Sequence, residues 1–243
     1  MDKPAAVIVI PCYNERNRLV MEEFVCFGRK HPDIHFIFVD DGSSDGTGDL
    51  IRPHCGRQYL LLTLTRNSGK GEAVRQGLLT ALEQKAPLIG FWDADLATPL
   101  DTICFFVEEM NQNRNLDMII GSRILRFGAH IKRNFCRHII GRIFMTLMHC
   151  FFDFTVYDSQ CGAKMMTAEA AREVTKGPFV TRWLFDLEMI ARLQRFRRTD
   201  LSASLYEYPL PEWHEVGSSK VRIGTVFHDL LRLFYYYKIR RSQ

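Results

Sequence analysis

The chain reads Leu-Ile-Gly-Phe-Trp-Asp-Ala-Asp over residues 88–95, an apolar run that ends in two carboxylates. The run predicts a short buried β-strand, and because side chains alternate along an extended chain, Asp93 and Asp95 face the same way beyond its end. Carboxylates spaced in this way can share one divalent cation, such as Mg²⁺ or Mn²⁺. The tripeptide alone is more often a pair of solvated loop acids, so the surrounding sequence decides its meaning.

Short apolar runs predict three more strands before this one, and stretches with helical periodicity separate them. The expected strands cover residues 5–10, 34–39 and 58–63, and the expected helices cover residues 15–30, 46–53 and 71–85. Strands that alternate with helices predict an α/β fold in which helices cover a parallel sheet.

A polar cluster follows each of the other three strands, as it does residues 88–92. The clusters are Pro-Cys-Tyr-Asn-Glu at 11–15, Asp-Asp-Gly-Ser-Ser-Asp at 40–45 and Asn-Ser-Gly-Lys-Gly at 67–71. Ligands of open parallel sheets bind at the carboxyl ends of the strands. The four clusters therefore predict one site, which favours a functional role for Asp93 and Asp95.

The remainder of the chain has a different pattern, with fewer clear strands. The expected strands cover residues 116–121, 163–167 and 202–208, and the expected helices cover residues 139–152, 185–196 and 221–238. No repeat or linker marks a second domain. We expect one domain over residues 1–220, with a first half at about 1–115 and a second half at about 116–220. A C-terminal amphipathic helix and basic tail would then cover residues 221–243.

Charge and composition exclude several classes of protein. The net charge is +4, and residues 123–142 hold six Lys or Arg residues without any acid. No aromatic residues interleave with basic ones in a repeat, so this stretch predicts a local anion site and no nucleic-acid surface. The seven cysteines form no C-x-x-C pair, which favours reduced thiols in a cytoplasmic protein over a zinc cage or a disulfide framework.

Two residues within these clusters, Asp41 and Lys70, suggest nucleotide binding. Asp41 at a strand end can accept hydrogen bonds from ribose hydroxyls or a base N–H, although the neighbouring glycines and serines also fit a plain turn. Lys70 adds a positive charge to a helix N-terminus, which already favours anions. The eight-residue phosphate-loop pattern is missing, so ATP hydrolysis is disfavoured.

Basic residues also recur at helical spacing before an apolar stripe. Arg126, His130, Arg133 and Arg137 would share one face if their segment were helical, either as a solvated face or as a phosphate site. The stripes within residues 139–152 and 227–234 fit either core packing or a helix at a lipid headgroup boundary. No window is long and apolar enough for a spanning helix, so we expect any membrane contact to be peripheral.

Taken in order, these motifs resemble those of the family 2 glycosyltransferases of GT-A fold. Within them the chain is similar to the polyprenyl-phosphate sugar transferases, especially the dolichyl-phosphate β-glucosyltransferase branch. The remaining matching motifs are Gly-Ser-Arg at 121–123, Asp-Ser-Gln-Cys-Gly-Ala-Lys at 158–164, Phe-Asp-Leu-Glu at 185–188 and Trp-x-x-x-Gly-Ser-Ser-Lys at 213–220. The resemblance implies a Rossmann-like, mostly parallel sheet flanked by helices, with amphipathic helices at the C-terminus. It also implies that residues 1–220 form a catalytic domain, with a nucleotide-binding half at about 1–115 and an acceptor-binding half at about 116–220.

The resemblance also implies residue roles. The residues expected to bind the nucleotide are Pro11, Tyr13, Asn14, Glu15, Asp41, Lys70 and Asp93, and those expected to bind the metal are Asp93 and Asp95. The residues expected to bind the acceptor phosphate are Arg123, Arg133, Arg137, Ser219 and Lys220. Those expected on the acceptor side are Asp158, Gln160 and Glu188. The set expected to take part most directly in catalysis is Asp93, Asp95, Arg123, Arg137 and Asp186.

The implied reaction is an inverting transfer of a hexose from a nucleotide diphosphate sugar to a polyprenyl phosphate. A phosphomonoester is already anionic at neutral pH, since its second pKa is about 6, so it needs positioning more than a base. Asp186 would be the base if the acceptor were a hydroxyl. The mannose-transferring branch carries a glutamine and an arginine where Leu-Ala-Thr at 96–98 and His214 stand here, which favours glucose from UDP-glucose.

Other functions remain open. They are transfer of mannose from GDP-mannose, transfer of a sugar to a hydroxyl acceptor, nucleotidyl transfer, and a non-catalytic nucleotide-sugar-binding membrane adaptor. The anchoring helix of the eukaryotic glucosyl enzymes has no counterpart, so we expect peripheral association with the inner face of the cell membrane. The sequence does not predict an oligomeric state.

Overall fold

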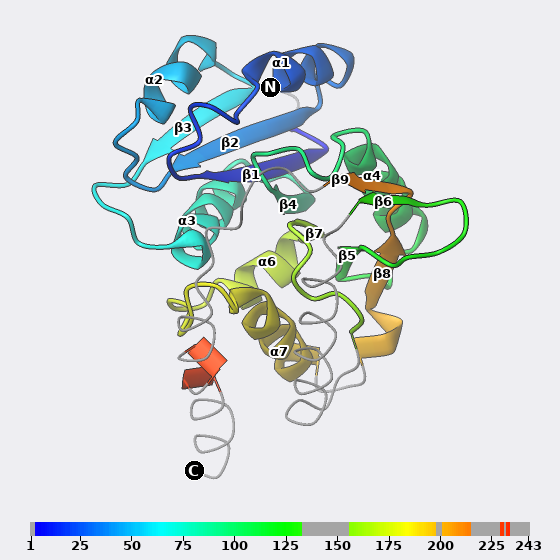
Figure 1. Ribbon diagram of the computed structural model, residues 1–243. Helices are drawn as coiled ribbons and strands as arrows, with labels where there is room; N and C mark the ends of the chain where they lie inside the picture. The colour runs from blue at the N-terminus through cyan, green and yellow to red at the C-terminus, as the bar shows by residue number, and fades with distance from the viewer. Residues whose placement is uncertain (1–2, 133–155, 198–200, 215–228, 231, 234–243) are drawn as a thin grey trace.

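The computed structural model describes residues 3–132, 156–197, 201–214, 229–230 and 232–233. Within these residues a seven-stranded sheet has the order β3-β2-β1-β4-β7-β5-β8 (Figure 1). The strands are β1 (Ala6–Cys12), β2 (Ile34–Asp40), β3 (Tyr59–Thr63), β4 (Leu88–Trp92), β5 (Met118–Ser122), β7 (Ala163–Thr167) and β8 (Leu205–Pro209). A separate parallel pair consists of β6 (His130–Lys132) and β9 (Glu212–His214).

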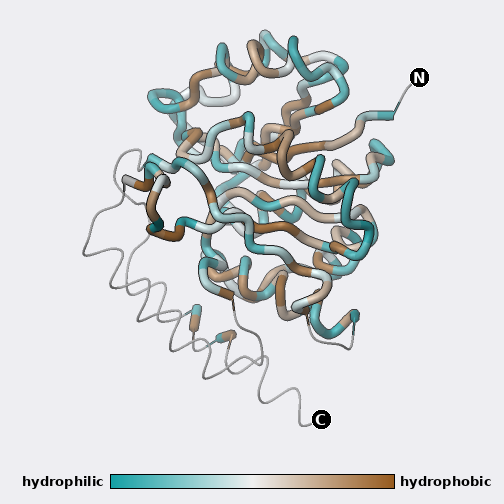
Figure 2. Tube along the Cα trace, turned by 90° about the vertical axis from the view of Figure 1, so that its right-hand side faces the viewer, coloured by the Kyte–Doolittle hydropathy of each residue, from teal (hydrophilic) through white to brown (hydrophobic). Residues whose placement is uncertain are grey.

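Helices cover both faces of the sheet. They are α1 (Met21–Lys30), α2 (Thr47–Ile51), α3 (Lys70–Glu83), α4 (Thr102–Gln112), α6 (Ala168–Val174) and α7 (Phe185–Arg197), with 3₁₀ turns at Arg52–His54 and Leu201–Ala203. In Figure 1, α1 and α2 lie on one side of the sheet, and α3, α6 and α7 lie on the other. Figure 2 shows apolar residues along the strands and polar ones on the outer helices and loops.

The order of the strands creates a switch point beside β1, and we refer to the sheet edge there, at the carboxyl ends of the strands, as the crevice. Strand β1 pairs in parallel with β2 on one side and with β4 on the other. The connection after β1 therefore leads toward one edge of the sheet, and the connection after β4 leads toward the other edge. Such a switch point is where open α/β sheets bind ligands. Residues 13–15 follow β1 and residues 93–95 follow β4, so the fold brings these two clusters together.

The second half of the sheet directs further loops to the same edge. β7 runs antiparallel to β4, with Ala163 opposite Trp92, so the loop before β7 lies beside the residues that follow β4. β5 runs antiparallel to β7 and therefore parallel to β4, so its carboxyl end also points to this edge. The sheet is mostly parallel, and its one reversed strand brings residues 158–162 to the site.

The sequence predicted the central strands to within two residues. The helix expected over residues 15–30 begins only at Met21, because the backbone N–H groups of Arg18 and Leu19 bond back to the Glu15 carbonyl in a turn. Four elements were not predicted, namely α4, α6, β6 and β9.

One predicted alignment is wrong. Arg126 lies in a loop and His130 lies in β6, so these residues do not share the face of a helix with Arg133 and Arg137. Arg133, Arg137 and the apolar stretch at 139–152 lie outside the described residues. Of residues 221–238 the structure describes only 229–230 and 232–233, which are helical, and the division at residue 220 stays a prediction. Among the described residues, no helix has the length and apolar content needed to cross a membrane.

Candidate active site

The clusters after β1 and β2 are joined by hydrogen bonds from backbone N–H groups to side-chain oxygens. Asn14 has the left-handed φ of 51°, which aims its backbone N–H at Ser43 Oγ, 2.9 Å away. Its side-chain Oδ1 accepts a hydrogen bond from the N–H of Ser44 at 3.0 Å, and the Glu15 N–H donates to Thr47 Oγ1 at 2.8 Å. The two loops therefore form one rigid wall of the crevice.

Asp41 connects this wall to the third cluster. Its Oδ1 and Oδ2 accept hydrogen bonds from the backbone N–H groups of Ser68 (2.7 Å) and Gly69 (2.8 Å). Burial raises the pKa of Asp41, although the two N–H groups act against this by favouring the charged form. Its carboxylate thus fixes the start of α3, so any contact with a nucleotide is an addition to this structural role.

Lys70 and the paired aspartates meet at the centre of the crevice. Lys70 Nζ lies 2.6 Å from Asp93 Oδ1. Burial acts to lower the pKa of Lys70, but the charges of Asp93 and Asp186 outweigh it, so the pKa is raised and the ammonium group is retained. Burial, followed by the charge of Asp93, raises the pKa of Asp95. The neighbouring carboxylates of Asp93 and Asp95 carry more negative charge than the single positive charge of Lys70 balances, so the site favours a further cation.

The same two carboxylates suit a divalent cation. The described residues contain no group of three or more His, Cys, Asp or Glu side chains able to hold a metal ion by themselves. Mg²⁺ commonly uses one or two carboxylates and takes its other ligands from water and substrate phosphates. The donor set of Asp93 and Asp95 therefore fits a cation that binds together with a diphosphate.

The loop before β7 packs directly on Asp93. The Asp93 N–H donates to the Gly162 carbonyl at 3.0 Å, and a Cβ added to Gly162 would lie 1.8 Å from Asp93 Oδ2. Only glycine leaves room for the carboxylate at this point. Residue 162 therefore sets the position of Asp93.

A buried ion pair supports this loop from below. Lys164 on β7 has no exposed surface, and its Nζ donates to Asp186 Oδ1 and to the Cys161 carbonyl, both at 2.6 Å. Burial raises the pKa of Asp186, while the charges of Lys164 and Lys70 oppose the rise. One oxygen of Asp186 is thus committed to Lys164.

Arg123 stands at the far side of the crevice. It donates to both oxygens of Asp158, from Nε at 2.6 Å and from Nη2 at 2.7 Å, and its guanidinium carbon lies 5.2 Å from the centre of the Trp213 ring. Burial acts to lower the pKa of Arg123, but the charge of Asp158 outweighs it. The pKa is therefore raised, and the guanidinium group stays charged. Glu207 in turn accepts hydrogen bonds from the backbone N–H groups of Tyr157 and Asp158.

Comparison with known proteins defines the family. The model of "Glycosyl transferase family 2" matches residues 7–175, which is more than half of the chain. This chain belongs to glycosyl transferase family 2. Its sequence is 30% identical to the dolichyl-phosphate beta-glucosyltransferase of Homo sapiens, over 88% of this chain and 68% of the human protein. It is also 30% identical to dolichyl-phosphate beta-glucosyltransferase ALG5C of Trichomonas vaginalis, over 95% of this chain and 71% of that protein.

Solved structures show that this glycosyltransferase has the GT-A fold. Glucosyl-3-phosphoglycerate synthase from Mycobacterium tuberculosis, in complex with Mn²⁺ and UDP-glucose, superposes with a TM-score of 0.68 over 94% of this chain and 78% of that one, at 16% identity. The mannosyltransferase PcManGT from Pyrobaculum calidifontis, in complex with GDP-Man and Mn²⁺, gives a TM-score of 0.63 over 98% of this chain and 65% of that one, at 17% identity. These likenesses establish the fold.

The predicted site residues of the glycosyltransferase fall into three groups. Those at the crevice, brought there by the carboxyl ends of the strands, are Pro11, Tyr13, Asn14, Glu15, Asp41, Lys70, Asp93, Asp95, Arg123, Asp158 and Gln160. Asp186, beneath the crevice, and Glu188 are both buried. Arg133, Arg137, Ser219 and Lys220 lie outside the described residues.

Glu188, expected on the acceptor side, has no exposed surface. Its carboxylate accepts hydrogen bonds from the Val180 N–H (2.9 and 3.1 Å) and from Arg192 Nη2 (2.8 Å). Any influence of Glu188 on an acceptor would therefore pass through the segment near residue 180 that it holds.

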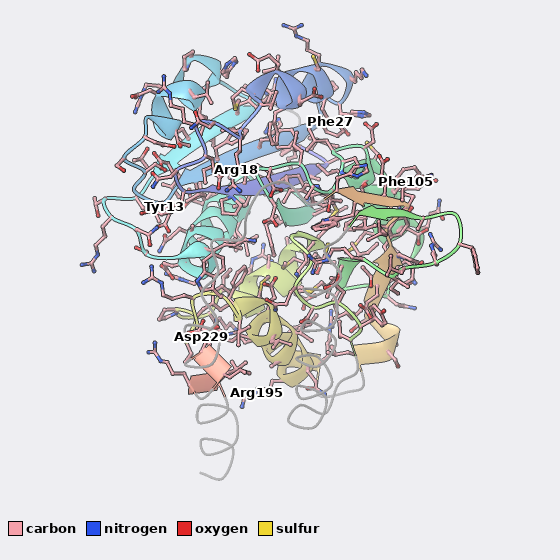
Figure 3. All side chains as sticks on the ribbon, in the orientation of Figure 1. Tyr13, Arg18, Phe27, Phe105, Arg195 and Asp229 are labelled. Carbon is pink, nitrogen blue, oxygen red and sulfur yellow. The ribbon has the colours of Figure 1, made fainter. Side chains whose placement is uncertain are left out.

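Two arginines of the site were not predicted. Arg18 donates to both oxygens of Glu15, at 2.6 and 2.7 Å, and these hydrogen bonds, followed by the charges of Glu15, Asp95 and Asp93, raise its pKa. Figure 3 shows Arg18 and Tyr13 on the same side of the sheet. Arg182 donates to Asn67 Oδ1 at 2.6 Å, next to the start of α3. A spacing of three residues connects Arg18 to the Glu15 motif, whereas nothing in the sequence connects Arg182 with Asn67, 115 residues away.

Proposed function

We propose that this glycosyltransferase transfers glucose from UDP-glucose to a polyprenyl phosphate and inverts the configuration of the anomeric carbon. The relatives of Homo sapiens and Trichomonas vaginalis, both named dolichyl-phosphate beta-glucosyltransferase, support this donor and this class of acceptor. The two solved structures of this fold contain different donors, but both contain Mn²⁺, which supports a divalent cation in the reaction.

One observation carries the proposal: Asp93, Asp95 and Lys70 converge at the switch point of the sheet. When bound there, a divalent cation would neutralise charge on the departing diphosphate. Lys70 adds a second positive charge from the N-terminus of α3. Tyr13, Glu15 and Asp41 form the adjoining wall, where we place the nucleoside of the donor.

The buried ion pair of Lys164 and Asp186 favours a phosphate acceptor over a hydroxyl acceptor. A base must be able to reach the proton that it removes. Asp186 Oδ1 is 2.6 Å from Lys164 Nζ and the residue is buried, so this carboxylate is poorly placed to act as a base. A phosphate oxygen attacks without losing a proton. The new bond joins that oxygen to the anomeric carbon, and the bond to the diphosphate breaks as UDP leaves.

Positive charge on the far side of the crevice suits the acceptor. Arg123 keeps its charge, is oriented by Asp158, and keeps 12% of its side chain exposed. We place the acceptor phosphate beside it and assign Arg133, Arg137, Ser219 and Lys220 to the same phosphate by their motifs. We also propose that the enzyme works peripherally at the inner face of the cell membrane.

A matched set of donors and acceptors tests the proposal. The purified chain would be incubated with Mn²⁺ or Mg²⁺, with UDP-glucose or GDP-mannose, and with a short polyprenyl phosphate or the corresponding polyprenol. Mass spectrometry of the lipid should detect a hexosyl product only with UDP-glucose and the phosphate. A product formed from the polyprenol, or from GDP-mannose in preference to UDP-glucose, would contradict the assignment of acceptor or donor.

A further inference from the structure

The loop between β5 and β6, residues 123–129, exposes large apolar side chains at its tip. Phe127 is fully exposed, and 57% of Leu125 is exposed. Single exposed apolar residues are ordinary on protein surfaces, but two at one tip add up to a patch that water solvates poorly. The loop projects from the side of the molecule that carries β6, β8 and α4 (Figure 1).

Hydrogen bonds hold this tip outward. At one end, Arg123 is clamped by Asp158, and at the other, the His130 N–H donates to the Pro211 carbonyl at 2.8 Å. Arg126 Nη2 donates to the Pro209 carbonyl at 3.1 Å, which ties the middle of the loop to β8. Gly128 has a φ of +82°, a conformation that turns the chain back without strain only in glycine.

An aromatic platform continues the apolar surface next to the loop. Phe105 on α4 stacks on Tyr208 of β8, with ring centres 6.3 Å apart, and Tyr208 contacts Tyr206 edge-on at 6.4 Å. Arg126 lies close enough to Tyr208 for its charge to influence the phenol, so the loop and the platform are neighbours. Figure 3 shows Phe105 on the same side of the molecule as the loop. Among the described residues, four of the seven exposed large apolar side chains belong to this surface, which comprises Phe105, Leu125, Phe127 and Tyr206.

The charge of the loop complements an anionic partner. Residues 123–132 contain Arg123, Arg126, His130 and Lys132 and no Asp or Glu. Arg126 and His130 are exposed. Apolar side chains at a tip, basic residues around them and tyrosines at the rim are the combination that suits the headgroup region of a bilayer.

We propose that Leu125 and Phe127 insert into the headgroup boundary of an anionic membrane, with Arg126 at the level of the lipid phosphates and the aromatic platform resting on the surface. The loop begins at Arg123, so its insertion would hold the acceptor side of the crevice against the lipid. In this respect the inference rests on the proposed function, because it gives a lipid-borne phosphate a direct route to Arg123.

Vesicle binding tests the inference without depending on catalysis. The full-length Leu125→Ser/Phe127→Ser variant would be compared with wild type by co-sedimentation with phosphatidylcholine vesicles that contain phosphatidylglycerol. Since each lost side chain removes a large apolar area, partitioning should fall by roughly tenfold or more. The matched control is Val20→Ser/Leu60→Ser. Val20 precedes α1 and is 47% exposed, and Leu60 is 38% exposed on β3, the edge strand opposite β8. This control should bind vesicles like wild type.

A tryptophan at the tip gives a second readout. Phe127→Trp should show a blue-shifted emission when vesicles are added, and brominated lipids should quench it. An unquenched tryptophan would overturn the insertion. Unchanged partitioning of the Leu125→Ser/Phe127→Ser variant would also overturn it. A change in the sedimentation of this variant in solution, without vesicles, would overturn it too, because it would mark the surface as a contact between proteins.

Two acceptors distinguish a failure of this inference from a failure of the proposed function. A short water-soluble polyprenyl phosphate should be glucosylated equally by wild type and by the Leu125→Ser/Phe127→Ser variant, whereas a long-chain acceptor in vesicles should be glucosylated more slowly by the variant. Equal rates on the vesicle-borne acceptor would overturn the role of the loop. Absence of transfer by wild type to either acceptor would instead contradict the proposed function, and the vesicle partitioning would still decide the inference.

Discussion

Lys164 and Asp186 form an ion pair of 2.6 Å that is shut off from solvent directly beneath the paired aspartates. Lys164 lies on the one reversed strand next to β4, and Asp186 lies in the first turn of α7. The Lys164 ammonium group also holds the Cys161 carbonyl. Through these contacts, the second half of the sheet fixes the loop that packs on Asp93.

Removal of Lys164 should destabilise the protein strongly. Lys164→Met leaves the Asp186 carboxylate buried without its partner, which costs about 3–5 kcal/mol of the free energy of unfolding. Urea unfolding followed by circular dichroism would measure this. Lys176→Met is the control, because Lys176 pairs with Glu173 on the surface and should change stability little.

The double variant Lys164→Met/Asp186→Leu distinguishes an uncompensated charge from lost packing. It removes both charges, so it should recover part of the stability that Lys164→Met loses. A double variant no more stable than the single one would show that the ion pair is not the reason for the loss.

A methyl group at residue 162 should impair catalysis. Gly162→Ala would press on the Asp93 carboxylate, since the added Cβ would lie 1.8 Å from Oδ2, and a displacement of about 1 Å at a reacting site costs roughly a hundredfold in rate. Initial rates of glycolipid formation would show it. Gly56→Ala adds the same methyl group where nothing lies within 4 Å and should keep wild-type activity. Equal rates for both variants would contradict the steric role of Gly162.

The Cys161 thiol should stay protonated well above neutral pH. Burial raises the pKa of Cys161 from 9.0 to about 11, against the charge of Arg123. At about pH 9 an alkylating reagent should therefore modify the exposed Cys26 and leave Cys161 unmodified in the folded protein, as peptide mass spectrometry would show. Rapid modification of Cys161 would contradict the assigned burial.

The same shift makes stability depend on pH. Between its ordinary pKa and its raised one, Cys161 holds its proton in the folded chain and loses it in the unfolded chain. Stability should consequently fall as the pH rises from about 9 to about 11, by up to roughly 1.4 kcal/mol per pH unit. Cys161→Ala should flatten this part of the profile of urea midpoints against pH, and an unchanged slope would contradict the prediction.

The sequence predicted the parts of the fold in which local pattern and final environment agree. β1, β2 and β4 are almost completely buried, so each is a mostly apolar run that leads into its polar cluster. The crevice could be predicted for the same reason, because parallel strands place their carboxyl ends at one edge. Asp93, Asp95 and Lys70 were assigned to one site on this basis, and the structure brings them together.

What could not be predicted depends on contacts between distant segments. The spacing of Arg126 and His130 fits a helix, but the bond of His130 N–H to the Pro211 carbonyl and the pairing with β9 place His130 in a strand instead. Glu188 could not be predicted for another reason. Its carboxylate bonds locally, to the Val180 N–H and to Arg192, but its motif does not reveal that the residue is buried. Nothing in the local sequence distinguishes such a carboxylate from one that faces a substrate.

The rate of glycolipid formation against cation concentration tests the central claim, that Asp93 and Asp95 together hold the cation needed for transfer. With UDP-glucose and a short polyprenyl phosphate, the wild-type rate should saturate with Mn²⁺ or Mg²⁺ and fall to background with EDTA. The Asp93→Asn/Asp95→Asn variant should be about a thousandfold slower or worse at every concentration, while Asp49→Asn, at an exposed acid, should match wild type. Near wild-type turnover by the double variant, or a wild-type rate indifferent to EDTA, would contradict the claim.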